Sequence, residues 1–277
     1  MSERSPNPDS SCGILYIATD DTYLEEARQS AERVSQLMDV PIAAITHREI
    51  DDKIFDQVLV DRNPTESFAE KPRNFLRSPF DKTLYLDTDT YLTDSVLELF
   101  DILNEYDIAV APSLSSELVS QVPPPRTQYN TGVVSYRSKK SVQEFLTLWQ
   151  DIYKQWHEER DVVEDQPSFL KAVYESDINL FTLSINYNAR LFSPGALHGE
   201  AKIVHGRPET GIENAARLIN ESSRFRTFYR NSYFSQSSAF KIVEDASPRY
   251  HLEKAISERG IKRTLLDAPQ YIKDRIL

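Results

Sequence analysis

Residues 83–92 of the chain read TLYLDTDTYL, a strand-like run that ends in two closely spaced acids. The first four residues are β-branched, aromatic or aliphatic, which predicts a buried strand. Asp87 and Asp89 follow where that strand ends, and two acids there are costly unless a cation or a partner neutralises them. Their oxygens suit Mn²⁺ or Mg²⁺, either of which can hold the phosphates of a nucleotide. A lone Asp-x-Asp is more often a solvated turn, so the prediction of an ion site depends on the motifs found elsewhere in the chain.

The composition of the 277 residues narrows the function classes. The net charge of −11 argues against a nucleic-acid binder. Only seven glycines occur, and neither G-x-x-x-x-G-K nor G-x-G-x-x-G is present, so no glycine-rich phosphate loop is expected. The single cysteine, Cys12, excludes an intrachain disulfide. No apolar run reaches membrane-spanning length, and the N-terminal residues lack a signal peptide's apolar core, so we expect a cytoplasmic protein.

Strand-like and helix-like segments alternate along most of the chain. Strand, helix and strand in this order imply an α/β fold with a mostly parallel central sheet and helices on its faces. We expect a disordered tail over residues 1–12, one α/β domain over 13–208 and a helical C-terminal extension over 209–277, through which the protein could form an oligomer. The expected strands are 13–19, 41–46, 57–60, 83–86, 107–111, 133–136, 180–183 and 201–204. The first expected helix is capped within 20–22 and runs to about 38, and the others are 70–78, 95–104, 139–157 and one that begins after 164–167.

Five short segments occur in a recognisable order. They are Lys71, SPFDKTLYLDTDT at 78–90, YNTGV at 129–133, EDQ at 164–166 and IVHGRP at 203–208. Each is weak alone, but the ordered set resembles the nucleotide-sugar glycosyltransferases of the GT-A fold, with the glycogenin-like family 8 as the closest match. The resemblance covers roughly residues 13–208. It implies metal-dependent transfer of a sugar, such as a hexose, from a nucleotide diphosphate sugar to an acceptor hydroxyl, with retention.

The resemblance also implies which residues bind the ion. Asp87 and Asp89 match the family's Asp-x-Asp motif, and His205 matches the histidine that completes the ligand set. Three protein ligands leave positions open for two phosphate oxygens. The alternative is that His205 is an ordinary histidine at the end of a strand, as a lone histidine usually is.

Other matching residues are expected to contact the donor, and a UDP-sugar is favoured. The nucleobase would rest against the backbone of Ala18 and Thr19, with Tyr23 stacked on it, although Tyr23 fits helix packing nearly as well. In an open parallel sheet, ligands gather at such carboxyl ends of strands. Thr88 would offer its backbone to the ribose, and Lys71 lies at the family's spacing from Asp87.

Arg207 marks a departure from the family, whose longer His-x-x-Gly-x-x-Lys-Pro segment is shortened here to HGRP at 205–208. Its guanidinium could take over the diphosphate contact, since it matches phosphate bidentately. A solvated surface arginine is an equally good interpretation, because the shortening leaves the position of that cation open.

The transferred sugar is expected to meet two further motifs. Asn130 supplies a donor and an acceptor, and Gly132 permits close approach of the backbone, although Asn and Gly are also common turn residues. Asp165 and Gln166 match the family's catalytic pair. An Asp at a helix start is most often an N-cap. Gln166 is a poor nucleophile, so orientation or charge stabilisation is the expected role.

Two other enzyme classes remain open at this point. A haloacid-dehalogenase-like phosphatase could use Asp87 as its nucleophile, but it would place this motif on the first strand. A sugar nucleotidyltransferase would need a glycine-rich loop after the first strand, where residues 18–21 read ATDD. For the favoured function, the expected partners are the nucleotide-sugar donor and a glycan, lipid or protein acceptor, with no nucleic acid and no integral membrane segment.

Overall fold

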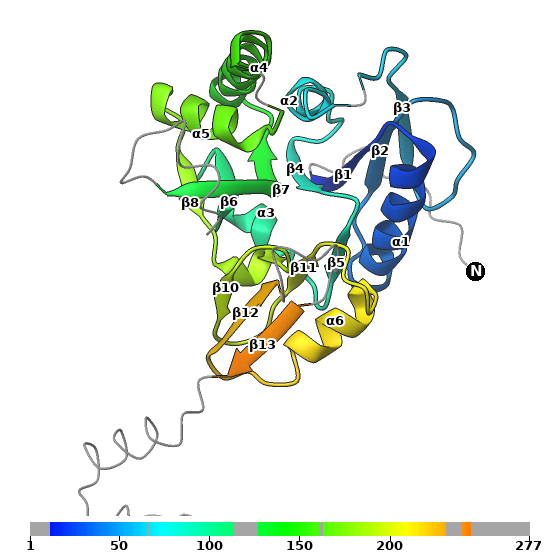
Figure 1. Ribbon diagram of the computed structural model, residues 1–277. Coiled ribbons are helices and arrows are strands. Elements are labelled where there is room, and N and C mark those ends of the chain that lie inside the picture. Colours follow the sequence, from blue (N-terminus) through cyan, green and yellow to red (C-terminus); the bar gives the residue numbers. More distant parts are fainter. Residues whose placement is uncertain (1–11, 66, 114–126, 161–162, 231–239, 245–277) are drawn as a thin grey trace, which may run out of the picture.

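The computed structural model describes residues 12–65, 67–113, 127–160, 163–230 and 240–244, and a seven-stranded sheet forms their centre (Figure 1). Residues 1–11, 66, 114–126, 161–162, 231–239 and 245–277 lie outside the described residues, so most of the tail expected over 1–12 is not tested. In spatial order the sheet contains β3 (Gln57–Val60), β2 (Ile42–Thr46), β1 (Cys12–Ala18), β4 (Lys82–Leu86), β7 (Gln128–Arg137), β6 (Ile108–Ser113) and β8 (Leu180–Thr182).

The sheet is mostly parallel, as the sequence predicts. Strand β1 pairs in parallel with β2 and β4, β2 with β3, and β6 with β8, whereas β7 runs antiparallel to both β4 and β6. The strand expected at 133–136 is longer than the sequence predicts, because residues 128–132 also belong to β7. The reversed direction of β7 places this early part beside the carboxyl end of β4, where Leu86 faces Val133.

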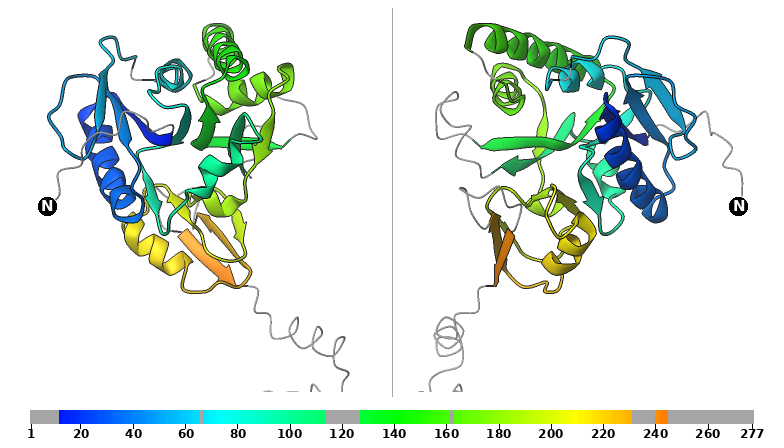
Figure 2. Two further views of the ribbon diagram at one scale, coloured as in Figure 1. Left: turned by 180° about the vertical axis from the view of Figure 1, so that it is seen from behind. Right: turned by 45° about the vertical axis from the view of Figure 1, so that its right-hand side comes forward.

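Helices cover both faces of the sheet (Figure 2). One face packs against α1 (Asp21–Leu37) and α3 (Glu98–Ile102), and the other against α2 (Glu70–Phe75), α4 (Lys140–Arg160) and α5 (Gln166–Glu175). Burial of apolar side chains on both sides explains why the inner strands read as continuous hydrophobic runs. The sequence predicts that α1 ends at about residue 38, close to its observed end at Leu37, and predicts α3 longer than it is.

Helix α1 begins where the sequence predicts a cap. The Asp20 side chain accepts hydrogen bonds from the backbone nitrogens of Thr22 at 2.7 Å and Tyr23 at 2.9 Å. These bonds satisfy donors that the first helical turn would otherwise leave unpaired. The cap fixes the point at which the chain leaves β1 and enters the helix.

Two small three-stranded sheets lie beside the main one. The first contains β5 (Thr90–Leu92), β11 (Ile203–His205) and β9 (Ala189–Arg190), and the second contains β10 (Gly195–Leu197), β12 (Arg226–Arg230) and β13 (Phe240–Glu244). A 3₁₀ turn, η2 (Ile185–Tyr187), precedes β9, and α6 (Ile212–Ile219) follows β11. Residues from α6, β9, β11 and β12 share one buried apolar cluster.

The expected helical extension over 209–277 needs correction. Helix α6 fulfils it, but 226–230 and 240–244 are strands, and β12 pairs with β10 of the preceding segment. The β-branched and aromatic residues at 227–229 favour a strand, whose pairing partner lies far away in the sequence. The division of the chain at residue 208 stays a prediction. Within the described part of the chain, no helix is long and apolar enough to cross a membrane.

Candidate functional site

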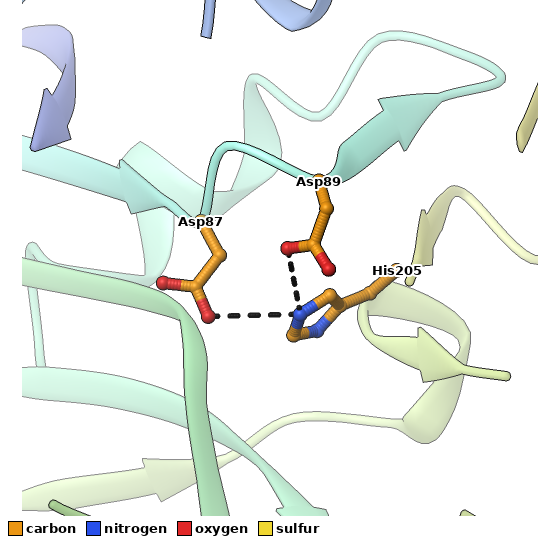
Figure 3. Close-up of side chains that lie close together, drawn as sticks. All are labelled: Asp87, Asp89 and His205. Atoms are coloured by element: carbon orange, nitrogen blue, oxygen red, sulfur yellow. Dashed lines mark ion pairs between the residues drawn. The ribbon is translucent and has the colours of Figure 1, made fainter. Parts of the chain in front are cut away.

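The three predicted metal ligands converge at the carboxyl edge of the main sheet (Figure 3). Asp87 directly follows β4, Asp89 directly precedes β5, and His205 is the last residue of β11. His205 Nε2 lies 3.2 Å from Asp89 Oδ1 and 3.6 Å from Asp87 Oδ2. One ligand atom from each residue falls within a span of 4.8 Å. Residues 118 positions apart are thus brought to one point, as the resemblance implies.

Local backbone pairing explains this convergence. Strands β5 and β11 are antiparallel neighbours in which Thr90 faces His205. The backbone nitrogen of Asp87 donates to the carbonyl of Gly132 at 2.7 Å, and that of Gly206 donates to the carbonyl of Asp89 at 2.9 Å. Each acid is therefore tied through its own backbone to a neighbouring segment, which fixes where its carboxylate can point.

The space at this point fits a divalent ion. Two carboxylates and an imidazole form a donor set that such an ion accepts. The adjacent wall is a glycine: a Cβ on Gly132 would lie 2.2 Å from His205 Cε1 and 2.7 Å from Asp87 Oδ2. Any side chain at 132 would therefore displace two candidate ligands. Close approach, rather than an unusual backbone angle, explains the glycine.

Lys71 connects the first acid to the start of α5. Its Nζ lies 2.9 Å from Asp87 Oδ1 and 3.6 Å from Asp165 Oδ2, and its side chain is buried. Burial alone would lower the pKa of Lys71, but the charges of Asp165 and Asp87 outweigh it and raise that pKa. Tyr85 donates its hydroxyl to Asp87 Oδ1 at 2.5 Å, and burial together with Asp87 raises the pKa of Tyr85 well above its usual value.

Arg207 contacts Asp89 in the same way as Lys71 contacts Asp87. Its guanidinium lies 3.0 Å from Asp89 Oδ2, donates to both carboxylate oxygens of Glu26 at 2.5 and 2.6 Å, and lies over the ring of Tyr23. Burial opposes the charge of Asp89, but His205 and Arg207 overcome it and hold the pKa of Asp89 below its usual value. The hydrogen bonds to Glu26 likewise raise the pKa of Arg207 despite its partial burial.

Asp165 directly precedes α5, but its side chain does not cap the helix. Its side chain makes no capping hydrogen bond, is 1% exposed, and accepts from Thr131 Oγ1 at 2.6 Å. The carboxylate is therefore turned toward β7 and Lys71 instead of its own helix. Gln166 also points to β7, where its Oε1 accepts from Asn130 Nδ2 at 3.4 Å. The two motifs expected to meet the transferred sugar, residues 165–166 and the YNTG segment at 129–132, are therefore in contact.

Asn188 is a site residue that the sequence reasoning missed. It is 2% exposed, donates from Nδ2 to Asn130 Oδ1 at 2.8 Å, and its Oδ1 lies 2.9 Å from His205 Nδ1. Two further residues were missed, Glu26 beside Arg207 and Glu70, which accepts a short hydrogen bond from Thr19. No sequence signal identifies Asn188, because it lies in a stretch without hydrophobic periodicity, just before the two-residue strand β9.

The predicted nucleoside contacts are spread over a wider area. Ala18 and Thr19 are buried at the end of β1, whereas Tyr23 is 46% exposed, which argues against a pure packing role. Thr88 donates its hydroxyl to Glu26 at 2.8 Å. A hollow of about 450 Å³ borders this region, and Thr88, Asp89 and Arg207 are among its lining residues. Ala18, Thr19 and Lys71 are not, so one hollow does not unite all predicted contacts.

Comparisons with known proteins test the fold assignment independently of the motifs. No family model and no curated protein sequence matches the chain. Among solved structures, the bifunctional glycosyltransferase WbbM shares 16% identity over 74% of this chain and 47% of its own, with a TM-score of 0.51. The glycosyltransferase GlyE of Streptococcus pneumoniae TIGR4 shares 19% over 65% and 47%, with a TM-score of 0.46. Mouse xyloside xylosyltransferase 1 shares 13% over 72% and 99%, with a TM-score of 0.49.

These likenesses concern the fold. The chain spans about half the length of WbbM and of GlyE, and the identities are low. The similarity to WbbM, together with the mixed, mostly parallel sheet, confirms the GT-A fold that the ordered motifs imply. What the site does has to be argued from its own residues.

Proposed function

We propose that this protein is a metal-dependent glycosyltransferase that moves a sugar from a nucleotide diphosphate sugar to an acceptor hydroxyl, with retention at the sugar carbon. The observation that carries the proposal is the convergence of Asp87, Asp89 and His205 at the carboxyl edge of an α/β sheet. Ligands of open α/β sheets bind at this edge. Two carboxylates and an imidazole that strand pairing holds at this edge contribute little to stability, because clustered charges are costly to bury. The same arrangement is well suited to binding a cation.

Asp87, Asp89 and His205 would hold Mn²⁺ or Mg²⁺, which offsets negative charge on the leaving diphosphate. Lys71 and Arg207 are the cations nearest these ligands. Each already touches one of the acids, at 2.9 Å and 3.0 Å, so each is positioned to transfer hydrogen bonds to phosphate oxygens when the donor enters. The fork of Arg207 suits two oxygens at once.

The residues beyond the cations are assigned to the rest of the donor. Asn130, Gly132, Asp165 and Gln166 lie together on β7 and the start of α5, where they would orient the transferred sugar. Asp165 is buried and bonded to Thr131, which suits holding sugar hydroxyls better than collecting a proton from the acceptor. The diphosphate itself can accept that proton on the same face.

The nucleoside is assigned to the other side of the Asp87–Asp89 turn. Ala18 and Thr19 would meet the base through their backbone, and Thr88 would meet the ribose. The exposed ring of Tyr23, over which the Arg207 guanidinium now lies, would stack on the base. We favour a UDP-sugar as donor and a glycan, lipid or protein as acceptor. A cytoplasmic location also remains part of the proposal.

The competing enzyme classes fit the architecture less well. Three strands precede β4, so Asp87 is not on the first strand, where a haloacid-dehalogenase-like phosphatase would carry its nucleophile. Helix α1 follows β1 through Thr19 and Asp20, without the glycine-rich loop that a nucleotidyltransferase would need.

The decisive experiment compares ligands with and without metal. UDP at a hundredfold excess over its dissociation constant should add about 2.7 kcal/mol to the free energy of unfolding, but only with Mn²⁺ or Mg²⁺ present. Free monosaccharides should add little. The protein should also hydrolyse a UDP-sugar slowly with Mn²⁺ and leave a generic phosphate ester intact. Full activity in excess chelator, or equal stabilisation by UDP without metal, would refute the proposal.

A further inference from the structure

Asn188 sits between two site residues that come from distant parts of the chain. Its amide bridges Asn130 on β7 and His205 on β11, and all three side chains are buried. Buried amides have to satisfy donors and acceptors at the same time, so their orientation is constrained by what surrounds them. At the far end the bridge continues from Asn130 to Gln166.

The orientation of the whole bridge follows from one backbone group. The nitrogen of Gly132 can only donate, and it lies 3.1 Å from the side chain of Asn130, so the atom it meets has to be Oδ1. The same Oδ1 lies 2.8 Å from the Asn188 amide, which therefore presents Nδ2 as the donor. The opposite end of that amide is then Oδ1, and it faces His205.

This chain of donors and acceptors fixes the proton on the histidine. An amide oxygen 2.9 Å from His205 Nδ1 can only accept, so Nδ1 has to carry hydrogen. In the neutral ring, Nε2 then keeps a lone pair, and it is the atom that lies 3.2 Å from Asp89 and 3.6 Å from Asp87. Without the bridge, those two carboxylates would favour hydrogen on Nε2.

We propose that Asn188 is a positioning residue that holds His205 in the Nδ1–H form and aims its Nε2 lone pair between Asp87 and Asp89. The consequence for metal affinity rests on the proposed function, since it takes this gap as the ion site. The partner of a metal-binding histidine fixes the ring's tautomer and orientation, and its loss typically costs about 10–100-fold in affinity.

The test uses two variants that separate positioning from packing. Asn188→Asp keeps an oxygen facing Nδ1 but loses the donor to Asn130 and adds a buried charge. Asn188→Leu has a similar shape and no acceptor. Positioning predicts that Asn188→Asp binds Mn²⁺ about as well as the wild type, whereas Asn188→Leu binds it about 10–100-fold more weakly. A packing role predicts the reverse order, because the buried charge is the more disruptive change.

The tautomer is measured directly as well. Protein labelled with ¹⁵N-histidine, without metal and at a pH where the ring is neutral, should show hydrogen on His205 Nδ1 in the wild type and in Asn188→Asp. Asn188→Leu should show it on Nε2. The signal is assigned with His205→Gln, and Asn179→Leu, an exposed asparagine bonded to the Glu105 carbonyl, is the matched control.

The two readouts distinguish the two proposals. Hydrogen on Nε2 in the wild type overturns the positioning role, even if Asn188→Leu fails to fold. Equal Mn²⁺ affinity in all variants overturns it too, while leaving the ion site standing. A wild-type protein with hydrogen on Nδ1 that binds no Mn²⁺ would instead refute the metal-dependent function and keep the assignment of Asn188.

Discussion

The Nζ atom of Lys71 lies 2.9 Å from Oδ1 of Asp87 and is itself buried. It also lies 3.6 Å from Asp165, so one ammonium serves a candidate metal ligand and a candidate sugar-binding acid. When no ion is bound, the positive charge of Lys71 offsets the repulsion between these clustered carboxylates. The same logic applies to Arg207 beside Asp89.

Lys71→Met should therefore destabilise the metal-free protein strongly. Removing one partner of a buried ion pair typically costs about 3–5 kcal/mol, because the remaining charge is left uncompensated. Urea denaturation measures the loss. The double variant Lys71→Met/Asp165→Asn should recover part of it, and the exposed Lys140→Met should change stability by less than about 0.5 kcal/mol. A Lys71→Met protein as stable as the wild type would contradict this account.

Gly132→Ala should impair the ion site specifically. The new Cβ would have to push His205 and Asp87 apart, and overpacking of this kind costs about 1–3 kcal/mol. Gly211→Ala is the matched control, because Gly211 has a φ of 79° with open space around it. Backbone strain there costs a similar amount. Calorimetric titration should show weaker Mn²⁺ binding for Gly132→Ala alone, and equal binding by both variants would count against the close approach.

The alkaline stability of the protein should depend on Tyr187. Partial burial, and then the hydrogen bond to Glu98, raise the pKa of Tyr187 to about 12. Because the folded state holds this proton more tightly than the unfolded state, the stabilisation is complete below pH 10 and is lost between pH 10 and 12. Melting temperatures across that window should fall more steeply for the wild type than for Tyr187→Phe. Parallel curves would show that the hydroxyl contributes nothing.

Local sequence patterns predict most of the helices and strands of this fold, but they do not predict which strands pair with each other. The run at 133–136 is visibly a strand, yet nothing in it reveals that β7 lies between β4 and β6 and opposes both. The sequence predicts residues 226–230 as part of a helical extension, because no local pattern indicates that they pair with β10, about thirty positions earlier. Pairing across such distances is decided by packing, which a single sequence does not display.

The same contrast holds for the candidate site, where motifs predict some residues and contacts between distant segments determine the role of others. The ordered motifs predict Asp87, Asp89 and His205 as ligands of one ion, and the structure brings the three side chains together. Asn188 has no motif in the sequence reasoning, because its role comes from a contact with Asn130, 58 positions away. The sequence does not identify Glu26 as a site residue either, because a glutamate on the polar face of a helix is common. Only the structure shows its ion pair with Arg207.

Arg207→Met should weaken nucleotide binding without weakening metal binding. Its guanidinium now offsets the charge of Asp89, so its removal should leave Mn²⁺ affinity unchanged or higher. Lost charged hydrogen bonds to the diphosphate, worth about 1.5–3 kcal/mol, should weaken UDP binding with Mn²⁺ by roughly 10–100-fold. The control is Arg217→Met, an exposed arginine on α6 paired with Glu221. Unchanged UDP affinity in Arg207→Met would remove Arg207 from the donor site.

The stereochemical outcome is tested through Asp165. An inverting enzyme needs a base that takes the acceptor's proton, and Asp165→Asn would then lose about 10²–10⁴-fold in turnover at unchanged donor affinity. Asp165 is 1% exposed and bonded to Thr131, which favours a role in holding the sugar. Under retention, Asp165→Asn should therefore lose donor affinity as well as turnover, whereas the exposed neighbour variant Glu164→Gln should lose neither. Proton NMR of the first-formed product gives the independent check, because retention yields an α-linked product from an α-linked donor. A β-linked product would overturn the retaining mechanism and, with it, the likeness to family 8 on which that part of the proposal depends.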